Sequence, residues 1–198
     1  MLGLHDIKER LNPILKSPRH ALLDSKSKGG GNDSLHRTAA VLIIIHSKNH
    51  IPHIILTKRS SMLKSHSGEI SFPGGQYSPV EDLDLLDTAL RETKEELGLG
   101  FRPENIQGRL NSVNTLTSNF TIVPFITLRK RIPEPNIFTN EVECIVDIPL
   151  QPTLATYQPD FEHYHISRQD VYKFMYRGVV IWGATARILK QLYACLCT

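Results

Sequence analysis

The chain has 198 residues, a length that suits one large domain. Apolar residues make up 40% and charged residues 22% of the chain, a balance typical of a globular fold rather than a disordered one. Three cysteines are too few for a disulfide framework, which favours a reducing, cytoplasmic location. The longest apolar run, Ala39 to Ile45, is far shorter than the roughly 20 residues of a membrane span, so we expect no membrane association.

Residues 4 to 23 show helical spacing that is interrupted by Pro13 and Pro18. Residues 25–34 are rich in glycine and serine, which predicts a flexible linker. The sequence therefore predicts an N-terminal helical segment with its linker, residues 1–34, followed by a second domain, residues 35–198.

Two β-rich runs, AAVLIII and IPHIILTK, follow the linker and are joined by a polar hairpin loop, His46 to His50. A turn at Ser78 and Pro79 then precedes a helix over residues 83–97 that ends at Gly98 and Gly100. Strands are expected over residues 108–113, 121–128 and 143–148, with a final apolar helix over 179–193. Strands and helices without βαβ alternation predict an α+β or α/β sandwich.

Charge is distributed unevenly along the chain, although the formal net charge is only +3. Seven acidic and two basic residues lie between Glu81 and Glu96, whereas the rest of the chain has 21 basic and 13 acidic residues. A compact acidic site in basic surroundings suits a divalent cation with a polyanionic ligand. The alternative is an ordinary solvated acidic helix.

On a helical wheel, Glu92, Glu95 and Glu96 share one narrow face. Three like charges repel one another, and a bound cation would offset that repulsion. Oxygen ligands without a nearby cysteine or histidine favour Mg²⁺ or Mn²⁺ over zinc. Arg91 lies one turn from Glu95 and is placed to hold the carboxylates in position. The opposite face of the helix is expected to pack in the core through Leu83, Leu86, Leu90 and Leu97.

The segment Phe72-Pro73-Gly74-Gly75 ends an extended run before this helix, and its two glycines allow a ligand to approach the backbone closely. Together, Gly75 through Leu99 resembles the Nudix box: a Gly, five residues, a Glu, seven residues, then Arg-Glu-aliphatic-any-Glu-Glu-any-Gly-aliphatic. The second half matches from Arg91 onward, with Thr93 at the aliphatic position. The first half is about two residues longer, which leaves Glu81, Asp82 and Asp84 as alternatives for the first Glu.

A second pattern is narrower. Leu56-Thr57-Lys58-Arg59-Ser60, Lys64, Gly68 and Phe72-Pro73-Gly74-Gly75 resembles the signature of the coenzyme A pyrophosphatase branch of Nudix hydrolases, with Lys64 in place of an Arg. Glu141-Val142 and the segment 181–186 are also similar to that branch. The resemblance covers about residues 37 to 190 and implies a Nudix-type α/β/α sandwich with a mixed β-sheet.

The resemblance implies an enzyme that uses Mg²⁺ or Mn²⁺ to hydrolyse coenzyme A to 4′-phosphopantetheine and 3′,5′-ADP. By analogy, Glu92, Glu95 and Glu96 would bind metal, and Glu141 would be a further ligand or the base. The substrate phosphates would lie against the side chains or backbone of Lys58, Arg59, Lys64, Gly74 and Gly75.

Two other functions are retained as alternatives. One is a Nudix pyrophosphatase for another nucleoside diphosphate derivative, such as ADP-ribose. The other is a non-catalytic module that binds nucleotide; we expect no nucleic-acid partner, since no aromatic-rich basic strand of the RNA-recognition type is visible. The apolar segment 179–192 also offers an interface for a homodimer.

Overall fold

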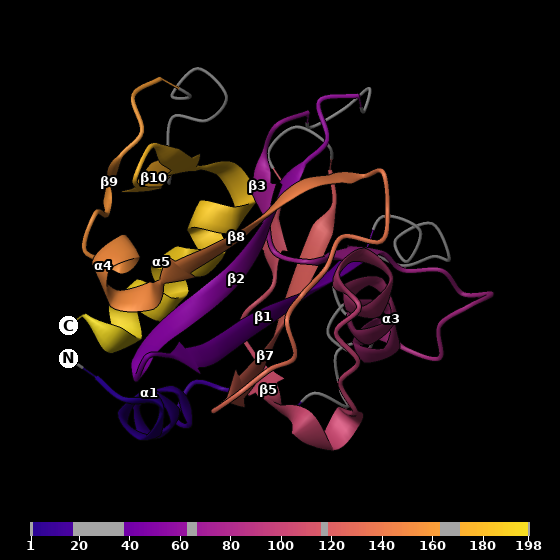
Figure 1. The fold of residues 1–198 in the computed structure, drawn as a ribbon, viewed down its shortest axis with the longest axis horizontal. Coiled ribbons are helices and arrows are strands. Elements are labelled where there is room, and N and C mark those ends of the chain that lie inside the picture. Colours follow the sequence, from indigo (N-terminus) through magenta and orange to yellow (C-terminus); the bar gives the residue numbers. More distant parts are fainter. Residues whose placement is uncertain (1, 18–37, 63–66, 116–118, 163–170, 198) are drawn as a thin grey trace.

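The centre of the protein is a mixed β-sheet, seen in this computed structural model, which describes residues 2–17, 38–62, 67–115, 119–162 and 171–197 (Figure 1). Its strand order is β3-β2-β1-β7-β5, with β4 beside β1, β6 beside β7 and β8 beside β2. The strands are β1 (Thr38–Lys48), β2 (Ile51–Arg59), β3 (Ile70–Ser71), β4 (Gly74–Gln76), β5 (Ile106–Arg109), β6 (Val113–Asn114), β7 (Thr121–Arg129) and β8 (Val142–Pro149).

Parallel and antiparallel pairs occur in this one sheet. Strands β1 and β7 run parallel, from the pair Thr38 and Thr121 to the pair His46 and Arg129. Strand β2 is antiparallel to both of its long neighbours, β1 and β8. The mixed sheet expected from the sequence is therefore confirmed.

The hairpin between β1 and β2 is tighter than the sequence suggested. Its turn consists of Asn49 and His50, whose φ angles are 51° and 65°, a conformation that asparagine tolerates well. Strand β1 continues to Lys48, so the expectation of a polar loop from His46 to His50 is wrong at its first three residues. His46 is buried because side chains along β1 alternate between the two faces of the sheet. The polar character of its side chain alone does not predict that burial.

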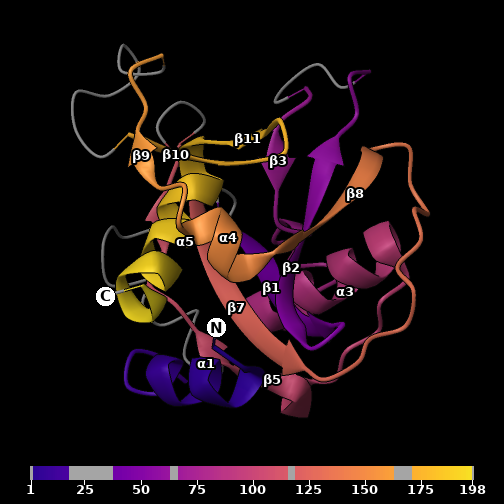
Figure 2. The ribbon, with the colours of Figure 1, turned by 60° about the vertical axis from the view of Figure 1, so that its left-hand side comes forward.

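Helices cover the sheet on both faces, which confirms the α/β/α sandwich (Figures 1 and 2). On one face, α1 (Leu4–Leu11), α4 (Leu150–Leu154) and α5 (Gly183–Leu196) share a core with Ile43, Ile45 and Ile54. On the other face, α3 (Leu85–Leu97) packs over a second core that contains Leu42 and Ile44. The two cores follow from β1, whose successive side chains point to opposite faces.

The N-terminal helix α1 is part of the same folded unit. Its Ile7 and Leu11 are fully buried in the core that α5 also lines. The proposed linker 25–34 and the proposed boundary between residues 34 and 35 lie outside the described residues. Dividing the chain there stays a prediction.

Two expected elements have different bounds in the structure. The final helix begins at Gly183, because Val179–Ile181 forms strand β11 in a small sheet with β9 (Gln158–Pro159) and β10 (Tyr172–Tyr176). The strand expected over residues 108–113 is interrupted and replaced by β5 and β6. The short helix η3 (Pro103–Asn105) precedes β5.

The apolar residues of α5 that suggested a homodimer interface, including Ile188, Leu189 and Leu192, are buried within the chain itself. The three cysteines are free, so no disulfide links parts of the chain. Within the described parts of the chain, no helix has the length and apolar character that crossing a membrane would require.

Candidate functional site

Helix α3 carries the acidic side chains of the site, and its ends are set by local signals. The carboxylate of Asp84 accepts a hydrogen bond from the Asp87 backbone N–H at 2.9 Å and caps the first turn. Gly98, with φ of 67°, ends the helix in a left-handed conformation. The helix thus begins at Leu85, two residues later than expected, and Leu83 is 88% exposed rather than part of the core.

The other side of α3 fixes the helix on the sheet. Thr93, which stands where the Nudix box has an aliphatic residue, is fully buried. Its hydroxyl donates a hydrogen bond to the Ala89 carbonyl at 2.7 Å, so the polar atom is satisfied within the helix. A threonine can therefore take the aliphatic position. The apolar residues of this buried face are Leu85, Leu86, Ala89, Leu90 and Leu97.

Strand β4 brings two glycines against the carboxylates of α3. Gly74 and Gly75 pair with Val41 and Ala40 of β1. A Cβ on Gly74 would lie 2.2 Å from the Ala40 carbonyl oxygen, and one on Gly75 would lie 2.5 Å from Cδ of Glu92. Only glycine fits at Gly74, because a side chain there would meet the backbone of β1, whereas a side chain at Gly75 would displace the Glu92 carboxylate.

Glu96 is the most deeply buried of the three carboxylates, with 6% of its surface exposed. Its Oε2 accepts a long hydrogen bond of 3.4 Å from the Gly74 N–H. Burial and the neighbouring charge of Glu92 raise the pKa of Glu96 to about 8. Burial likewise raises the pKa of Glu92, although Arg91 opposes that change. Negative charge at this place is therefore poorly compensated by the protein.

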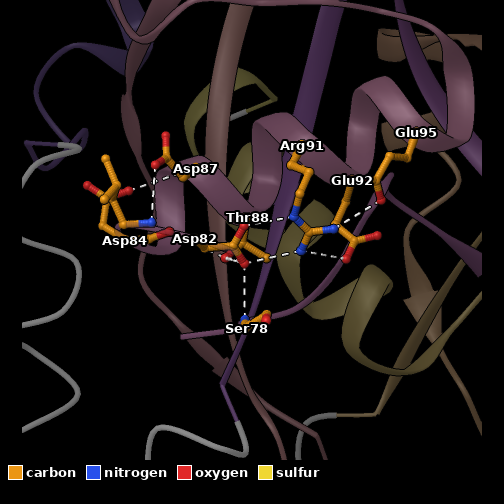
Figure 3. A network of polar contacts seen from close by, with 9 residues as sticks. Ser78, Asp82, Asp84, Asp87, Thr88, Arg91, Glu92 and Glu95 are labelled. Atoms are coloured by element: carbon orange, nitrogen blue, oxygen red, sulfur yellow. Dashed lines mark hydrogen bonds and ion pairs between the residues drawn. The ribbon is translucent and has the colours of Figure 1, made fainter. Parts of the chain in front are cut away.

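Arg91 joins three carboxylates in one network (Figure 3). It binds Asp82 with two nitrogens, Nε to Oδ1 at 2.8 Å and Nη2 to Oδ2 at 3.1 Å. It also lies 3.0 Å from an oxygen of Glu92 and donates to Glu95 at 3.0 Å. The guanidinium fork therefore links the carboxylates of Asp82, Glu92 and Glu95 on this face, and its role in positioning metal ligands stays a prediction.

The contacts of Arg91 also distinguish Glu81, Asp82 and Asp84, the three alternatives for the first Glu of the Nudix box. Asp82 is the one of them that meets Arg91, and it also accepts hydrogen bonds from the Ser78 N–H at 3.0 Å and the Thr88 hydroxyl at 2.9 Å. Burial raises the pKa of Asp82, but these hydrogen bonds outweigh it and leave the pKa below its ordinary value. Asp84 caps the helix instead, and Glu81 is exposed.

Glu92, Glu95 and Glu96 lie along one face of α3 but are not gathered into a closed ligand set. Among the described residues, the group of His, Cys, Asp or Glu side chains whose ligand atoms do lie within 4.8 Å of one another is a different one, His46, His53 and Asp147. Glu95 is about half exposed and turned toward Arg91, as is one oxygen of Glu92. The fit to a divalent cation rests on hard oxygen donors, on the burial of Glu96 beside Glu92, and on the absence of a side chain at Gly75, which lets the Glu92 carboxylate lie against the backbone.

The loop 130–141 carries Glu141 to the same end of the sheet. Backbone N–H groups of Asn136 and Phe138 donate to the carbonyls of Leu97 and Glu96, at 3.1 and 3.2 Å. The Phe138 ring lies so close to Gly98 that a Cβ there would be 2.4 Å from it. Glu141 then accepts a hydrogen bond from the Ser60 N–H at 2.7 Å through its backbone carbonyl. The loop thus ties the C-terminal end of α3 to the end of β2.

Basic residues at the end of β2 differ in how they are paired. Arg59 Nη2 lies 3.9 Å from Glu141, while its Nε is buried with no hydrogen-bond partner among the described residues. Lys58 donates to Glu143 at 2.6 Å, a contact that the sequence did not suggest. Lys64 lies outside the described residues. Arg59 thus has an unused donor beside the carboxylates, whereas Lys58 already has an acidic partner.

The NUDIX domain family matches residues 35–171 of the chain. A relative from Photorhabdus laumondii subsp. laumondii, described as an uncharacterized Nudix hydrolase NudL, is 32% identical over 198 residues, covering 97% of each chain. A relative of the same description from Yersinia enterocolitica is 34% identical over 160 residues, covering 78% of this chain and 78% of that one.

Solved structures show the same fold. A NUDIX hydrolase from Alicyclobacillus acidocaldarius superimposes with a TM-score of 0.55 at 19% identity, covering 80% of this chain and 91% of that one. The NUDIX domain of Shewanella oneidensis NrtR, solved with ADP ribose, gives a TM-score of 0.50 at 18% identity, covering 67% of this chain and 86% of that one.

The chain belongs to the Nudix hydrolase family, as the resemblance in the sequence implied. It is therefore an enzyme that hydrolyses pyrophosphate bonds of nucleotide-derived small molecules, and such enzymes use a divalent metal.

Proposed function

We propose that this Nudix hydrolase cleaves the diphosphate of coenzyme A, giving 4′-phosphopantetheine and 3′,5′-ADP. The observation that supports this substrate is the run from Leu56 to Gly75, which resembles the coenzyme A signature. Its described parts lie on β2, β3 and β4, and Gly74 and Gly75 at its end adjoin Glu96 and Glu92. The substrate signature and the carboxylates therefore meet at one place.

We assign the divalent cation, Mg²⁺ or Mn²⁺, to Glu92, Glu95 and Glu96. When bound there, it would neutralise phosphate charge and lower the pKa of a water molecule. The chain holds these carboxylates ready through Arg91, which spaces Glu92 and Glu95, and through the Gly74 N–H, which orients Glu96. Neither contact occupies both oxygens of a carboxylate, so each side chain keeps an oxygen for a cation.

Glu141 is the residue that we assign as base or additional ligand. It is 61% exposed at its side chain and lies 3.9 Å from Arg59, on the loop that contacts the end of α3. An exposed carboxylate at the edge of the site can accept a proton from an attacking water molecule and release it to solvent. In the reaction, the water oxygen bonds to one phosphorus, and the bridging oxygen leaves with the other phosphate.

The phosphates of the substrate are assigned to Arg59, Lys58 and Lys64, including the 3′-phosphate that distinguishes coenzyme A. The buried Nε of Arg59 has no hydrogen-bond partner among the residues that the structure describes, and a phosphate oxygen would satisfy it. Lys58 would exchange Glu143 for phosphate, which costs little because both partners of that ion pair are more than a third exposed. The absence of side chains at Gly74 and Gly75 would let the phosphates approach the backbone closely.

The experiment compares coenzyme A, its analogue without the 3′-phosphate, and ADP-ribose, each with Mg²⁺ or Mn²⁺ in ¹⁸O-labelled water. Mass spectrometry of the products identifies the substrate, the bond and the phosphorus that receives the label. We expect kcat/KM to be highest for coenzyme A and to fall without the 3′-phosphate. Preferential cleavage of ADP-ribose would overturn the coenzyme A assignment.

The second candidate is a Nudix pyrophosphatase for another nucleoside diphosphate derivative. The NUDIX domain of NrtR, whose structure contains ADP ribose, motivates the inclusion of that compound. Turnover of none of the three compounds would leave another nucleoside diphosphate derivative as the substrate. A cytoplasmic setting, where coenzyme A and Mg²⁺ are both present, is part of the same proposal and agrees with three free cysteines.

A further inference from the structure

Two histidines and an aspartate meet on the sheet, far from the carboxylates of α3. His46 of β1 and His53 of β2 are direct cross-strand partners, and Asp147 of β8 pairs with Ile55, two positions from His53. Because side chains alternate along a strand, all three point to the same face of the sheet. Six positions separate His53 from Arg59 along β2, which at about 3.3 Å per residue is roughly 20 Å.

The three side chains converge on one point. Oδ1 of Asp147 lies 3.0 Å from Nε2 of His46 and 2.9 Å from Nδ1 of His53. Each of the three residues offers one ligand atom within 4.8 Å of the other two, and the two imidazole rings are set at 62° with centroids 5.9 Å apart. Two nitrogens and one oxygen from three adjacent strands thus form a compact, rigidly supported donor set.

Burial and charge distinguish this cluster from a surface contact. The side chains of His46, His53 and Asp147 are 8%, 15% and 20% exposed. Burial alone would raise the pKa of Asp147, but hydrogen bonds from His46 and Lys48 hold it well below its ordinary value. Lys48 is 54% exposed and contacts the other oxygen, Oδ2, at 2.6 Å, so it leaves Oδ1 to the histidines.

We propose that His46, His53 and Asp147 form a zinc site that is separate from the catalytic carboxylates. Zinc prefers imidazole nitrogen together with carboxylate oxygen, at about 2.0–2.2 Å, in tetrahedral geometry. A tetrahedral zinc holds its ligand atoms roughly 3.3–3.5 Å apart. The observed separations of 3.0 and 2.9 Å then need to open by only a few tenths of an ångström. Water completes the fourth position.

The site would join β1, β2 and β8 at the end of the sheet opposite Arg59. It does not depend on the proposed substrate or on catalysis, so its failure and the failure of the coenzyme A assignment are distinguishable. The competing explanation is a hydrogen-bonded cluster in which both imidazoles donate to Asp147 and no metal binds. Metal binding to the full chain separates the two.

The experiment titrates the full chain with Co²⁺, a spectroscopic substitute for zinc, while excess Mg²⁺ occupies the carboxylates of α3. We expect one Co²⁺ to bind with the visible absorption of a four-coordinate site, without a thiolate band, and to be displaced by Zn²⁺. Changes in groups that merely orient metal ligands cost 10–100-fold in affinity, so loss of a direct ligand in H53Q is expected to weaken binding at least about 100-fold.

The matched control is H50N, because His50 lies in the adjacent turn, is exposed and has a positive φ that asparagine accepts. It should bind Co²⁺ like the wild type. A wild-type chain that binds no Co²⁺ under these conditions would overturn the proposal whether or not the variants fold. Unchanged binding in H53Q, with its circular dichroism spectrum intact, would also overturn it.

Discussion

A cluster of titratable side chains lies near each end of strand β2, and the pKa of the most buried carboxyl group is shifted upward in one cluster and downward in the other. Beyond Arg59, Glu96 is buried beside Glu92 and its pKa rises to about 8. Near His53, Asp147 is also half-buried, yet two imidazoles and an ammonium group lower its pKa. Burial raises the pKa of the carboxyl group in both clusters, so burial alone does not account for the difference.

The difference lies in the partners that the protein supplies. The cluster on α3 has Arg91, whose guanidinium is already engaged by Asp82. The cluster around Asp147 contains its own proton donors and is balanced without any ligand. The first is therefore expected to need an external cation for function, whereas the second is expected to be stable without metal and to bind zinc only by exchanging hydrogen bonds for coordination.

Glu96→Gln should have the largest effect on activity, because it replaces one oxygen of the most buried carboxyl group, a proposed ligand of the cation, with an amide nitrogen. We expect kcat to fall by about 1,000-fold or more, with the fold retained. Steady-state kinetics with Mn²⁺ and the melting temperature test this. D147N, at the opposite end of β2, should keep kcat. Equal losses in both variants would remove the functional distinction between the two clusters.

Gly75→Ala should have the next largest effect, because its Cβ would lie 2.5 Å from Cδ of Glu92 and displace that carboxylate. We expect kcat/KM to fall about 100-fold, since small misplacement of a reacting group has effects of this size. The matched control is G100A, where nothing lies within 4 Å of the added Cβ. Wild-type activity in G75A would show that Glu92 needs no such space.

Asp82→Asn should act on stability through Arg91. Loss of the charged hydrogen bonds is expected to reduce the free energy of unfolding by about 2 kcal/mol at pH 7. Because the folded pKa of Asp82 lies below its ordinary value, its contribution is present above about pH 4 and is lost as pH falls through the folded pKa. The melting temperatures of wild type and D82N should therefore converge in acid.

The control for this prediction is E81Q, since Glu81 is exposed and a neighbouring alternative for the same position of the box. It should leave the melting temperature unchanged. A larger loss in E81Q than in D82N would reverse the assignment of the residue that supports Arg91.

Phe138→Ala should have the smallest effect. The exposed ring covers Gly98 on the loop that leads to Glu141, so its loss loosens that loop while leaving the carboxylates of α3 in place. We expect kcat to fall about 5-fold with an unchanged affinity for Mn²⁺, measured by kinetics and calorimetry. F161A, another exposed phenylalanine, should behave like the wild type. Weaker Mn²⁺ binding in F138A alone would assign the ring to the metal site instead.

Local periodicity predicted the part of the site that lies on one helix. The shared face of Glu92, Glu95 and Glu96 follows from the helical repeat, and Gly98 marks the end of the helix. The predicted start of the helix at Leu83 was wrong, because the helical pattern was continued through Asp84, whose side chain instead caps the first turn. The role of Asp82 could not be derived, since it depends on how the preceding turn folds back on Arg91.

Helical and strand periodicity could not predict contacts between residues that are distant in the sequence. Asp147 is about a hundred positions from His46, and no repeat of residues relates the two strands. A two-residue turn at Asn49 and His50 places His46 opposite His53 in the hairpin. Recognising that turn in the sequence would have predicted that these two histidines are neighbours. The partner of Lys58, Glu143, likewise becomes a neighbour only when β2 and β8 pair.

The most direct test of the central claim is a crystal of the protein soaked in manganese, with the ion located by its anomalous scattering. We expect a peak coordinated by Glu92, Glu95 and Glu96, beside the backbone of Gly74 and Gly75. A density map with no ion there under saturating manganese, with Glu92 and Glu95 still held by Arg91 and Glu96 by the Gly74 N–H, would contradict this metal assignment.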